Sequence, residues 1–228
     1  MTGEQPSAEL LPHGYTNATH RAGSSVVKVY AGPDARERQQ REETALRALV
    51  GLLPVPRLLA SEPGRLTTEL SPGAHGQDLL DSGLGSEVLF ACGRLLFDLQ
   101  RVPARVVDSN ADPDATLVHG DFGPNNTLFD AEGTTAVLLA DWEWTHVGDP
   151  VTDLAWCEWI VRTHHRDRTG ALGALFDGYG DRPDWSARKQ AMLDRCHQHL
   201  VWARSWENRR AEVWVERITD VSTWRELP

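Results

Sequence analysis

Three oxygen-bearing side chains in the middle of the chain stand among short apolar runs. Asp121 and Asn126 lie in the loop between the runs 117–118 and 127–129, and Asp141 directly follows the run 136–140. Turn-forming residues separate the runs, so the pattern predicts a strand, a loop and a hairpin whose last strand ends in a carboxylate. Loop residues can aim side chains at a ligand. Carboxylate and amide oxygens suit Mg²⁺, whose remaining ligands often come from substrate phosphates.

Four sequence pieces occur in one order between residues 119 and 155. They are His119-Gly120-Asp121, then Asn126, then Asp141-Trp142-Glu143, and then Gly148-Asp149-Pro150 with Asp153-Leu154-Ala155. Together they resemble the catalytic loop and metal-binding segment of the aminoglycoside phosphotransferase and choline kinase-like family. Protein kinases carry a related loop, H-R-D-x-x-x-x-N, and a later D-F-G.

The resemblance implies an α+β, protein-kinase-like fold with two lobes. Residues 1–70 would form a small antiparallel-sheet N-lobe that binds nucleotide, and residues 71–228 a mostly helical C-lobe for catalysis and substrate binding. It implies transfer of the γ-phosphate of ATP or GTP to a hydroxyl of a small molecule. Asp121 would orient the hydroxyl and accept its proton, while Asn126 and Asp141 would hold Mg²⁺.

Lys28 interrupts an apolar strand pattern over residues 24–30, and it is one of only two lysines in the chain, against 21 arginines. A helix is predicted over residues 34–53, and Glu42 lies within about 30° of the centre of its apolar face. An inward carboxylate needs a partner, so Glu42 is predicted to pair with Lys28. Glu43 lies further from that face and is the second choice. The resemblance gives Lys28 the α- and β-phosphates to bind.

The nucleotide-binding positions that follow from the resemblance are weaker patterns. Gly14 and Asn17 resemble a glycine-containing nucleotide loop, although both are also common turn residues. A strand over residues 65–70 ends at Ser71-Pro72-Gly73, where the family has the hinge between its lobes. The Thr68 carbonyl and the Leu70 N–H are predicted to bond the purine there, with a one-residue slip possible.

The C-terminal half is predicted to be largely helical. Apolar periodicity indicates helices over residues 86–102, 153–162 and 185–224. Glu158 is a charged residue inside the apolar run of the second helix. Either an arginine neutralises it within the structure, or it faces the substrate.

Charge is divided unevenly along the chain. Residues 1–73 hold 8 acidic and 8 basic residues, whereas residues 74–228 hold 25 acidic and 15 basic ones. The resulting negative electrostatic field would attract a cationic acceptor. An amino-sugar or basic peptide antibiotic is therefore the first choice of acceptor. Glu143 and Glu158 are predicted to reach the rim of the substrate cleft. Ordinary solubility charge explains the imbalance equally well.

Composition excludes several other classes of protein. Cys92, Cys157 and Cys196 have neither disulfide-framework nor zinc spacing, which favours a reducing cytoplasm. No apolar run is long enough for a membrane span, the first ten residues do not resemble a secretory signal, and no basic stripe indicates nucleic-acid binding. Oligomeric state cannot be predicted.

Two other functions remain open. A metabolic kinase acting on choline, another amino alcohol, a sugar or a macrolide would use the same catalytic residues. A non-catalytic nucleotide-binding pseudokinase belongs to a different class, and the intact Lys28, Asp121, Asn126 and Asp141 argue against it. Walker A, Gly-x-Ser-x-Gly and Gly-x-Gly-x-x-Gly motifs are absent, which removes the commonest rival nucleotide-binding and hydrolase functions.

Overall fold

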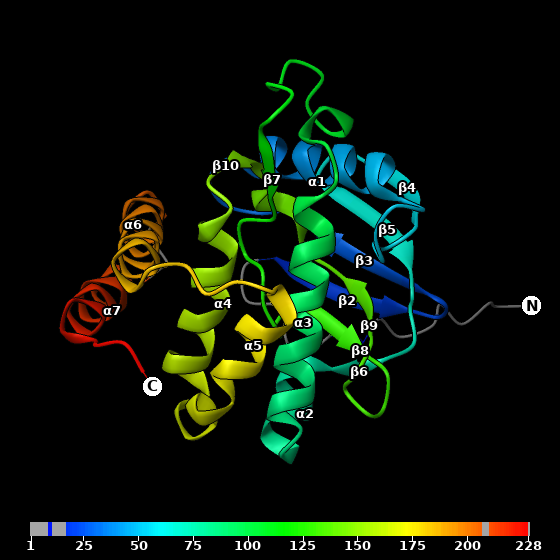
Figure 1. Ribbon diagram of the computed structural model, residues 1–228. Coiled ribbons are helices and arrows are strands. Elements are labelled where there is room, and N and C mark those ends of the chain that lie inside the picture. The colour runs from blue at the N-terminus through cyan, green and yellow to red at the C-terminus, as the bar shows by residue number, and fades with distance from the viewer. Residues whose placement is uncertain (1–8, 11–16, 207–209, 228) are drawn as a thin grey trace, which may run out of the picture.

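The computed structural model describes residues 9–10, 17–206 and 210–227. An antiparallel five-stranded sheet, in the order β1-β2-β3-β5-β4, occupies one side of the molecule (Figure 1). The strands of this sheet are β1 Glu9–Leu10, β2 Ala18–Ala22, β3 Ser25–Val29, β4 Leu58–Glu62 and β5 Arg65–Glu69. Helix α1, Ala35–Leu49, lies between β3 and β4 in the sequence. The predicted strand at 24–30 and helix at 34–53 are therefore confirmed, with the helix four residues shorter at its C-terminal end.

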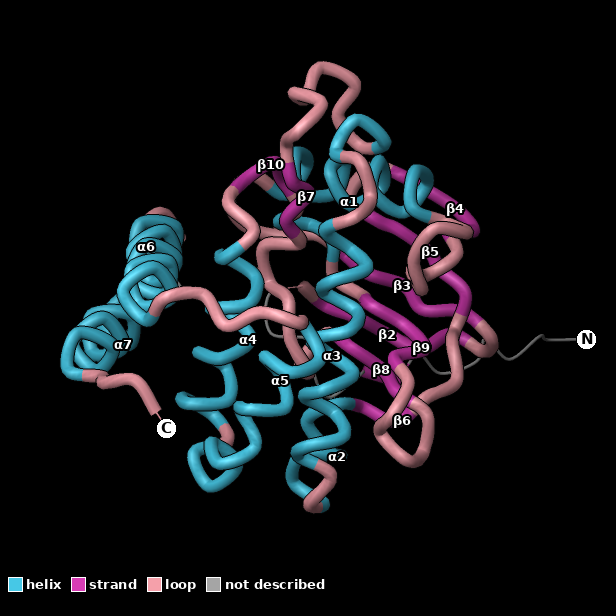
Figure 2. Tube along the Cα trace, viewed as in Figure 1, coloured by secondary structure: helices cyan, strands magenta, loops and turns pink. Residues whose placement is uncertain are grey.

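The remaining chain is mostly helical, with two small sheets that carry the central loops (Figure 2). The helices are α2 Gly76–Ser82, α3 Gly85–Gln100, α4 Val151–His164, α5 Leu172–Tyr179, α6 Trp185–Arg204 and α7 Ala211–Thr223, with short 3₁₀ turns at Ala104–Val106, Trp142–Trp144 and Arg166–Ala171. The short strands are β6 Ala74–His75, β7 Thr116–Val118, β8 Thr127–Phe129, β9 Ala136–Leu139 and β10 His146–Gly148. Among the described residues, no helix is both long and apolar enough to cross a membrane.

This arrangement confirms a small antiparallel sheet followed by a largely helical region. The stretch 185–224, predicted to be helical throughout, contains two helices instead of one. The helices α6 and α7 lie together on the side of the molecule away from the five-stranded sheet (Figure 1). The division into lobes at residues 1–70 and 71–228 remains a proposal; the chain leaves the five-stranded sheet after β5.

The main core lies where α3 packs against α5 and against the short strands β7 and β9. Its buried members include Leu96, Leu99, Phe129 and Leu154. The helices α3 and α5 approach so closely that glycine is required on both: a Cβ on Gly93 would lie 2.2 Å from the Leu175 carbonyl oxygen. The clashing atoms belong to the backbone, so no flexible side-chain end can move aside.

Gly93→Ala is therefore expected to destabilise the fold by about 3 kcal/mol, the upper end of the usual overpacking cost. The matched control is Gly173→Ala on α5, where an added Cβ meets nothing within 4 Å. This substitution should leave stability unchanged or raise it by up to about 1 kcal/mol, since alanine favours helix over glycine. Urea unfolding of both variants measures the difference; equal midpoints would contradict the close helix contact.

Candidate active site

The loop after β7 is held by the first turn of α4. Asp153 accepts hydrogen bonds from the backbone N–H groups of His119 (2.7 Å) and Gly120 (2.9 Å). Gly120 has φ 86°, and a Cβ there would lie 2.4 Å from the Trp144 carbonyl oxygen, so the turn requires glycine. Burial raises the pKa of Asp153 to about 6, although the two N–H donors act against this. The sequence motif contained Asp153 but did not reveal this supporting role.

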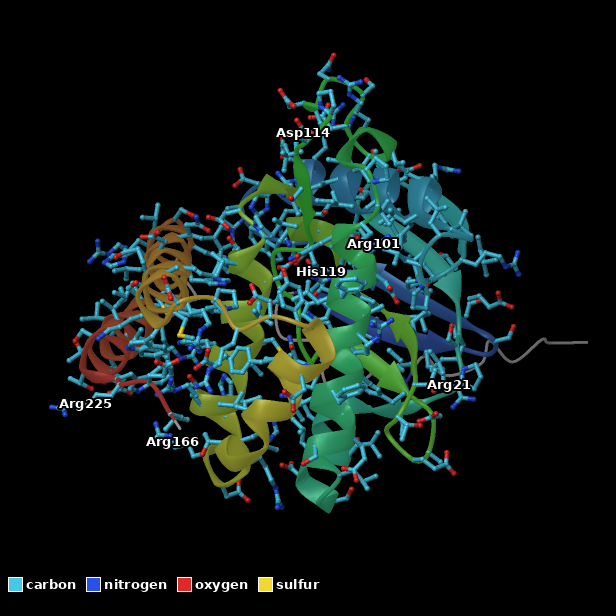
Figure 3. The ribbon with its side chains drawn as sticks, viewed as in Figure 1. Arg21, Arg101, Asp114, His119, Arg166 and Arg225 are labelled. Carbon is cyan, nitrogen blue, oxygen red and sulfur yellow. The ribbon has the colours of Figure 1, made fainter. Side chains whose placement is uncertain are left out.

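His119 fixes the other end of the loop and lies close to the middle of the molecule (Figure 3). Its Nδ1 accepts the Asp121 N–H (3.2 Å), and its Nε2 lies 2.9 Å from the Ala140 carbonyl oxygen. These partners assign the proton to Nε2. Burial lowers the pKa of His119 to about 4, so the ring is neutral near pH 7. It joins the loop to the residue before Asp141.

Asp121 receives hydrogen bonds on both carboxylate oxygens. Trp156 Nε1–H donates to Oδ1 (2.7 Å), Asn126 Nδ2–H donates to Oδ2 (2.8 Å), and Asn125 makes a longer contact of 3.4 Å with Oδ2. Burial and the neighbouring charge of Asp141 together raise the pKa of Asp121 to about 6. Trp156, which no sequence pattern singled out as functional, therefore orients the predicted base.

Asn126 and Asp141 lie beside each other because β8 pairs with β9. The Ala140 N–H donates to the Asn126 carbonyl oxygen (2.8 Å), and Asp141 then adopts the left-handed conformation, with φ 66°. Lys28 Nζ–H donates to Asp141 Oδ1. The three residues predicted to surround the metal and the hydroxyl, Asp121, Asn126 and Asp141, are thus brought together.

The predicted Lys28–Glu42 ion pair is present, with 2.6 Å between Nζ and Oε2. Tyr30 O–H donates to the same Glu42 oxygen. Burial would lower the pKa of Lys28, but Asp141, Glu42 and Glu143 outweigh it and raise the pKa well above its usual value. Oxygens of these three carboxylates lie within 4.8 Å of one another, which would suit a metal ion. The Lys28 ammonium already lies among them, so it is the cation of this group.

Next to this group, the oxygens of Asn126 and Asp141 form a donor set that is compatible with a magnesium ion. The Asn126 amide nitrogen donates to the Asp121 carbonyl oxygen (2.7 Å) and carboxylate (2.8 Å), which leaves the amide oxygen as a ligand. Asp141 uses Oδ1 for Lys28, and its side chain is 28% exposed. One carboxylate and one amide oxygen are a hard-oxygen set that Mg²⁺ accepts with phosphate and water.

Two of the residues predicted for the nucleotide loop and the hinge, Asn17 and Leu70, make hydrogen bonds within the protein. Gly14 lies outside the described residues. Asn17 is buried, and its amide donates to Glu143 Oε2 (2.7 Å), so its side chain is engaged inside the protein. The Leu70 N–H donates to the Ser24 carbonyl oxygen (2.9 Å), which corrects its predicted availability to a purine. Thr68 lies two residues earlier, opposite Val26 in the same ladder.

In an antiparallel ladder, residues two apart on a strand face the same neighbouring strand. The Thr68 carbonyl therefore points toward β3 like the Leu70 N–H, and not toward a ligand. A slip of one residue, which the prediction allowed, would reverse these directions, so the ladder contradicts only the pair formed by Thr68 and Leu70.

The two carboxylates predicted at the substrate rim are both buried, which corrects that placement. Glu143 has no exposed surface, and its Oε2 accepts from Arg38 Nη1 (2.8 Å). Burial raises the pKa of Glu143 to about 7, against the opposing effect of Lys28. Glu158 binds Arg162 (2.9 Å) through Oε1 and Arg188 (2.5 Å) through Oε2. Of the two roles open for Glu158, the structure favours the structural ion pair.

Glu158→Gln is expected to destabilise the protein by about 3–5 kcal/mol, because the buried Arg162 and Arg188 would both lose the carboxylate that they share, and only Arg188 keeps a second one, Glu226. Thermal unfolding measures the loss. The exposed pair of Arg57 and Glu69 provides the control, since Glu69→Gln removes the same charge where solvent screens it. An unfolding curve for Glu158→Gln that overlays the Glu69→Gln curve would show that the pair contributes nothing.

An aromatic stack adjoins Asp121 on the side of α4. Trp156 stacks on Trp159 with 4.1 Å between ring centroids, and His199 from α6 stacks on Trp214 from α7 at 4.3 Å. The Arg195 guanidinium lies 5.8 Å from the Trp156 ring centroid. Trp156 and Trp159 are almost fully buried.

The chain is similar to known proteins both in sequence and in fold. Residues 104–190 match the family model described as "Phosphotransferase enzyme family". This confirms, over the catalytic segment, the resemblance to the aminoglycoside phosphotransferase and choline kinase-like family. No curated protein sequence matches the chain.

Solved structures of this family share the whole fold. The gentamicin complex of APH(2")-IIa is 13% identical, with a TM-score of 0.71 over 96% of this chain and 92% of that one. Macrolide 2'-phosphotransferase MphH from Brachybacterium faecium is 18% identical, with a TM-score of 0.66 over 98% of this chain and 95% of that one. A choline/ethanolamine kinase family protein from Mesorhizobium loti is 17% identical, with a TM-score of 0.68 over 100% of this chain and 90% of that one. The two-lobed, protein-kinase-like fold is therefore confirmed.

Proposed function

We propose that this chain is a small-molecule kinase that transfers the γ-phosphate of ATP or GTP to a hydroxyl group. The observation that carries the proposal is the meeting of Asp121, Asn126, Asp141 and Lys28 in one site, with Glu42 on Lys28. A hydrogen-bonded carboxylate, a pair of metal-binding oxygens and a phosphate-binding lysine are the parts that phosphoryl transfer requires.

Each residue has a role that follows from its contacts. Asp121, fixed by Trp156 and Asn126, orients the acceptor hydroxyl and takes its proton. Lys28, fixed by Glu42, binds the α- and β-phosphates. Mg²⁺ held by Asn126 and Asp141 would neutralise charge on the phosphates as the bond to the leaving group breaks. Catalysis of this kind depends on positioning and electrostatics, so the rigid hydrogen bonds around Asp121 support it.

Both ATP and GTP are candidate phosphate donors. Among solved structures with this fold, one is an ADP-bound aminoglycoside phosphotransferase and another is a GDP complex. The corrected position of Leu70 removes the only backbone donor predicted for the purine. ATP and GTP therefore need to be compared directly.

For the acceptor, we propose a cationic amino-sugar or basic peptide antibiotic, with choline, sugars and macrolides as alternatives. The support is the net charge of −10, all of it after residue 73. Glu143 and Glu158 are not expected to contact the acceptor, because both are engaged in buried ion pairs. Surface charge is screened over about 8 Å at physiological salt, so a steered cationic acceptor should show a KM that rises with ionic strength.

The test is consumption of ATP and of GTP, with Mg²⁺, against aminoglycosides, basic peptides, macrolides, choline and sugars. Asp121→Asn protein serves as the matched control for contaminating kinases. The proposal predicts acceptor-dependent turnover with one nucleotide favoured and a phosphorylated product by mass spectrometry. Nucleotide binding without turnover against any acceptor would favour the pseudokinase. Efficient turnover of a neutral acceptor with a salt-independent KM would overturn the cationic preference alone.

A further inference from the structure

Arg38 is a fully buried arginine on α1, one helical turn before Glu42. Its Nε–H donates to the Pro33 carbonyl oxygen (3.1 Å) and its Nη2 to the Ala31 carbonyl oxygen (2.5 Å). Its Nη1 donates to the carboxylate of Glu143 (2.8 Å). The planar guanidinium thus joins the loop before α1 to the segment after Asp141. No sequence pattern predicted this contact.

Glu143 is held from several directions. Its Oε2 accepts from Arg38 and from Asn17 Nδ2–H (2.7 Å), and it lies 3.6 Å from Lys28 Nζ. Its backbone carbonyl oxygen accepts from Arg41 Nη1 (2.7 Å). Two arginines of α1 therefore contact the same residue, two positions after the predicted metal ligand Asp141.

These contacts close a ring through the active site. Residues four apart lie on one face of a helix, so Arg38 and Glu42 point the same way from α1. Glu42 binds Lys28, Lys28 binds Asp141, and the chain runs two residues on from Asp141 to Glu143, which binds Arg38. A shift of α1 along its axis would therefore break both ion pairs together.

We propose that Arg38 is a positioning residue: by binding Glu143 it locks α1 in the register that keeps Glu42, Lys28 and Asp141 in their catalytic arrangement. The inference rests on the proposed function for the catalytic part of its consequences. Arg38 does not reach the reacting atoms in this scheme. It acts through Glu143, whose backbone is continuous with the metal-binding Asp141.

The physical reason for such a lock is that a buried ion pair fixes the relative position of the two segments it joins. A buried ion pair adds little stability over a well-packed apolar pair, because desolvation offsets the attraction. It does, however, make misaligned arrangements costly, since either charge would be buried without its partner. A misplacement of about 1 Å at a reacting centre can lower a rate about 10²-fold, so a residue that prevents it contributes to catalysis without touching substrate.

The variants are Arg38→Met, Arg38→Lys and the double variant Arg38→Met with Glu143→Gln. Methionine has a similar length but cannot bind Glu143, and lysine keeps the charge without the planar fork. The double variant removes both charges, so it should fold even where the single one is unstable. Arg47→Met is the matched control on α1, because Arg47 forms an exposed ion pair with Glu43.

The first readout is amide hydrogen exchange without nucleotide, which does not depend on activity. Arg38→Met and the double variant should speed exchange in residues 35–49 and 141–145 together, while Arg47→Met should not. Exchange indistinguishable from the Arg47→Met control would overturn the lock. Wild-type nucleotide turnover is measured separately, so its absence would count against the proposed function and not against the lock.

The second readout is kcat at saturating nucleotide, corrected for folded protein. We expect a fall of about 10²-fold for Arg38→Met, partial recovery in Arg38→Lys, and a double variant that is more stable than Arg38→Met but equally slow. A role in stability alone predicts a lower Tm with an unchanged kcat in Arg38→Met, and a double variant in which the Tm recovers. That result would overturn the positioning role.

Discussion

Asp121→Asn should lower phosphoryl transfer about 10²–10⁴-fold, the usual effect of removing a general base. Asparagine keeps the size and shape of the side chain but loses the charge and the proton acceptor. The effect should appear in kcat, with nucleotide affinity little changed. Single-turnover transfer and equilibrium nucleotide binding separate the two quantities.

The contacts of Asp121 add a second consequence. Its two oxygens accept from Trp156 and Asn126, so an amide at this position must turn its NH₂ group toward one of these donors. The resulting unpaired contact costs about 1–3 kcal/mol locally. Trp156→Phe therefore serves as the companion variant, because it removes one donor and leaves the carboxylate. A loss in Trp156→Phe as large as in Asp121→Asn would assign the effect to orientation.

The pH dependence of kcat/KM follows from the same group. Burial raises the pKa of Asp121 to about 6, and the base must be ionised to act. The rate should therefore be constant above this pKa and fall tenfold per unit as pH drops below about 6. Asp121→Asn should lose this dependence. An acid limb that persists unchanged in the variant would show that another group controls it.

The residues that meet in the candidate site could be predicted from sequence because their signals are local. Asp121, Asn126 and Asp141 belong to short motifs, and the inward direction of Glu42 follows from the helical period alone. The Lys28–Glu42 contact then required only that the helix pack on the adjoining strand. Each of these inferences used residues within a few turns of one another or a contiguous pattern.

The two misplaced carboxylates share a different property: partners distant in the sequence help to decide their environment. Glu143 is neutralised by Arg38, 105 residues away, and Glu158 by Arg188, 30 residues away, together with Arg162 on its own helix. A charge in an apolar run predicts burial or a site with equal force until its partner is known. Leu70 failed for another reason, because one residue of strand register reverses the direction of every backbone group.

Asp141→Asn should remove nearly all Mg²⁺-dependent turnover while the protein stays folded. Asp141 has φ 66°, a left-handed conformation that asparagine tolerates better than alanine. The substitution therefore changes the charge with little backbone strain. An amide oxygen can still accept from Lys28, but it binds Mg²⁺ and offsets phosphate charge poorly.

We expect the rate to fall at least about 10²–10³-fold, the loss typical for one preorganised electrostatic contact to the transition state. Glu132→Gln, at an exposed position in the adjoining hairpin, removes one negative charge without touching the site. The two variants are compared by turnover across a Mg²⁺ titration and by thermal unfolding. If Asp141 holds the metal, high Mg²⁺ should partly restore Asp141→Asn and leave Glu132→Gln unaffected. A wild-type Mg²⁺ dependence in Asp141→Asn would mean that the ion lies elsewhere.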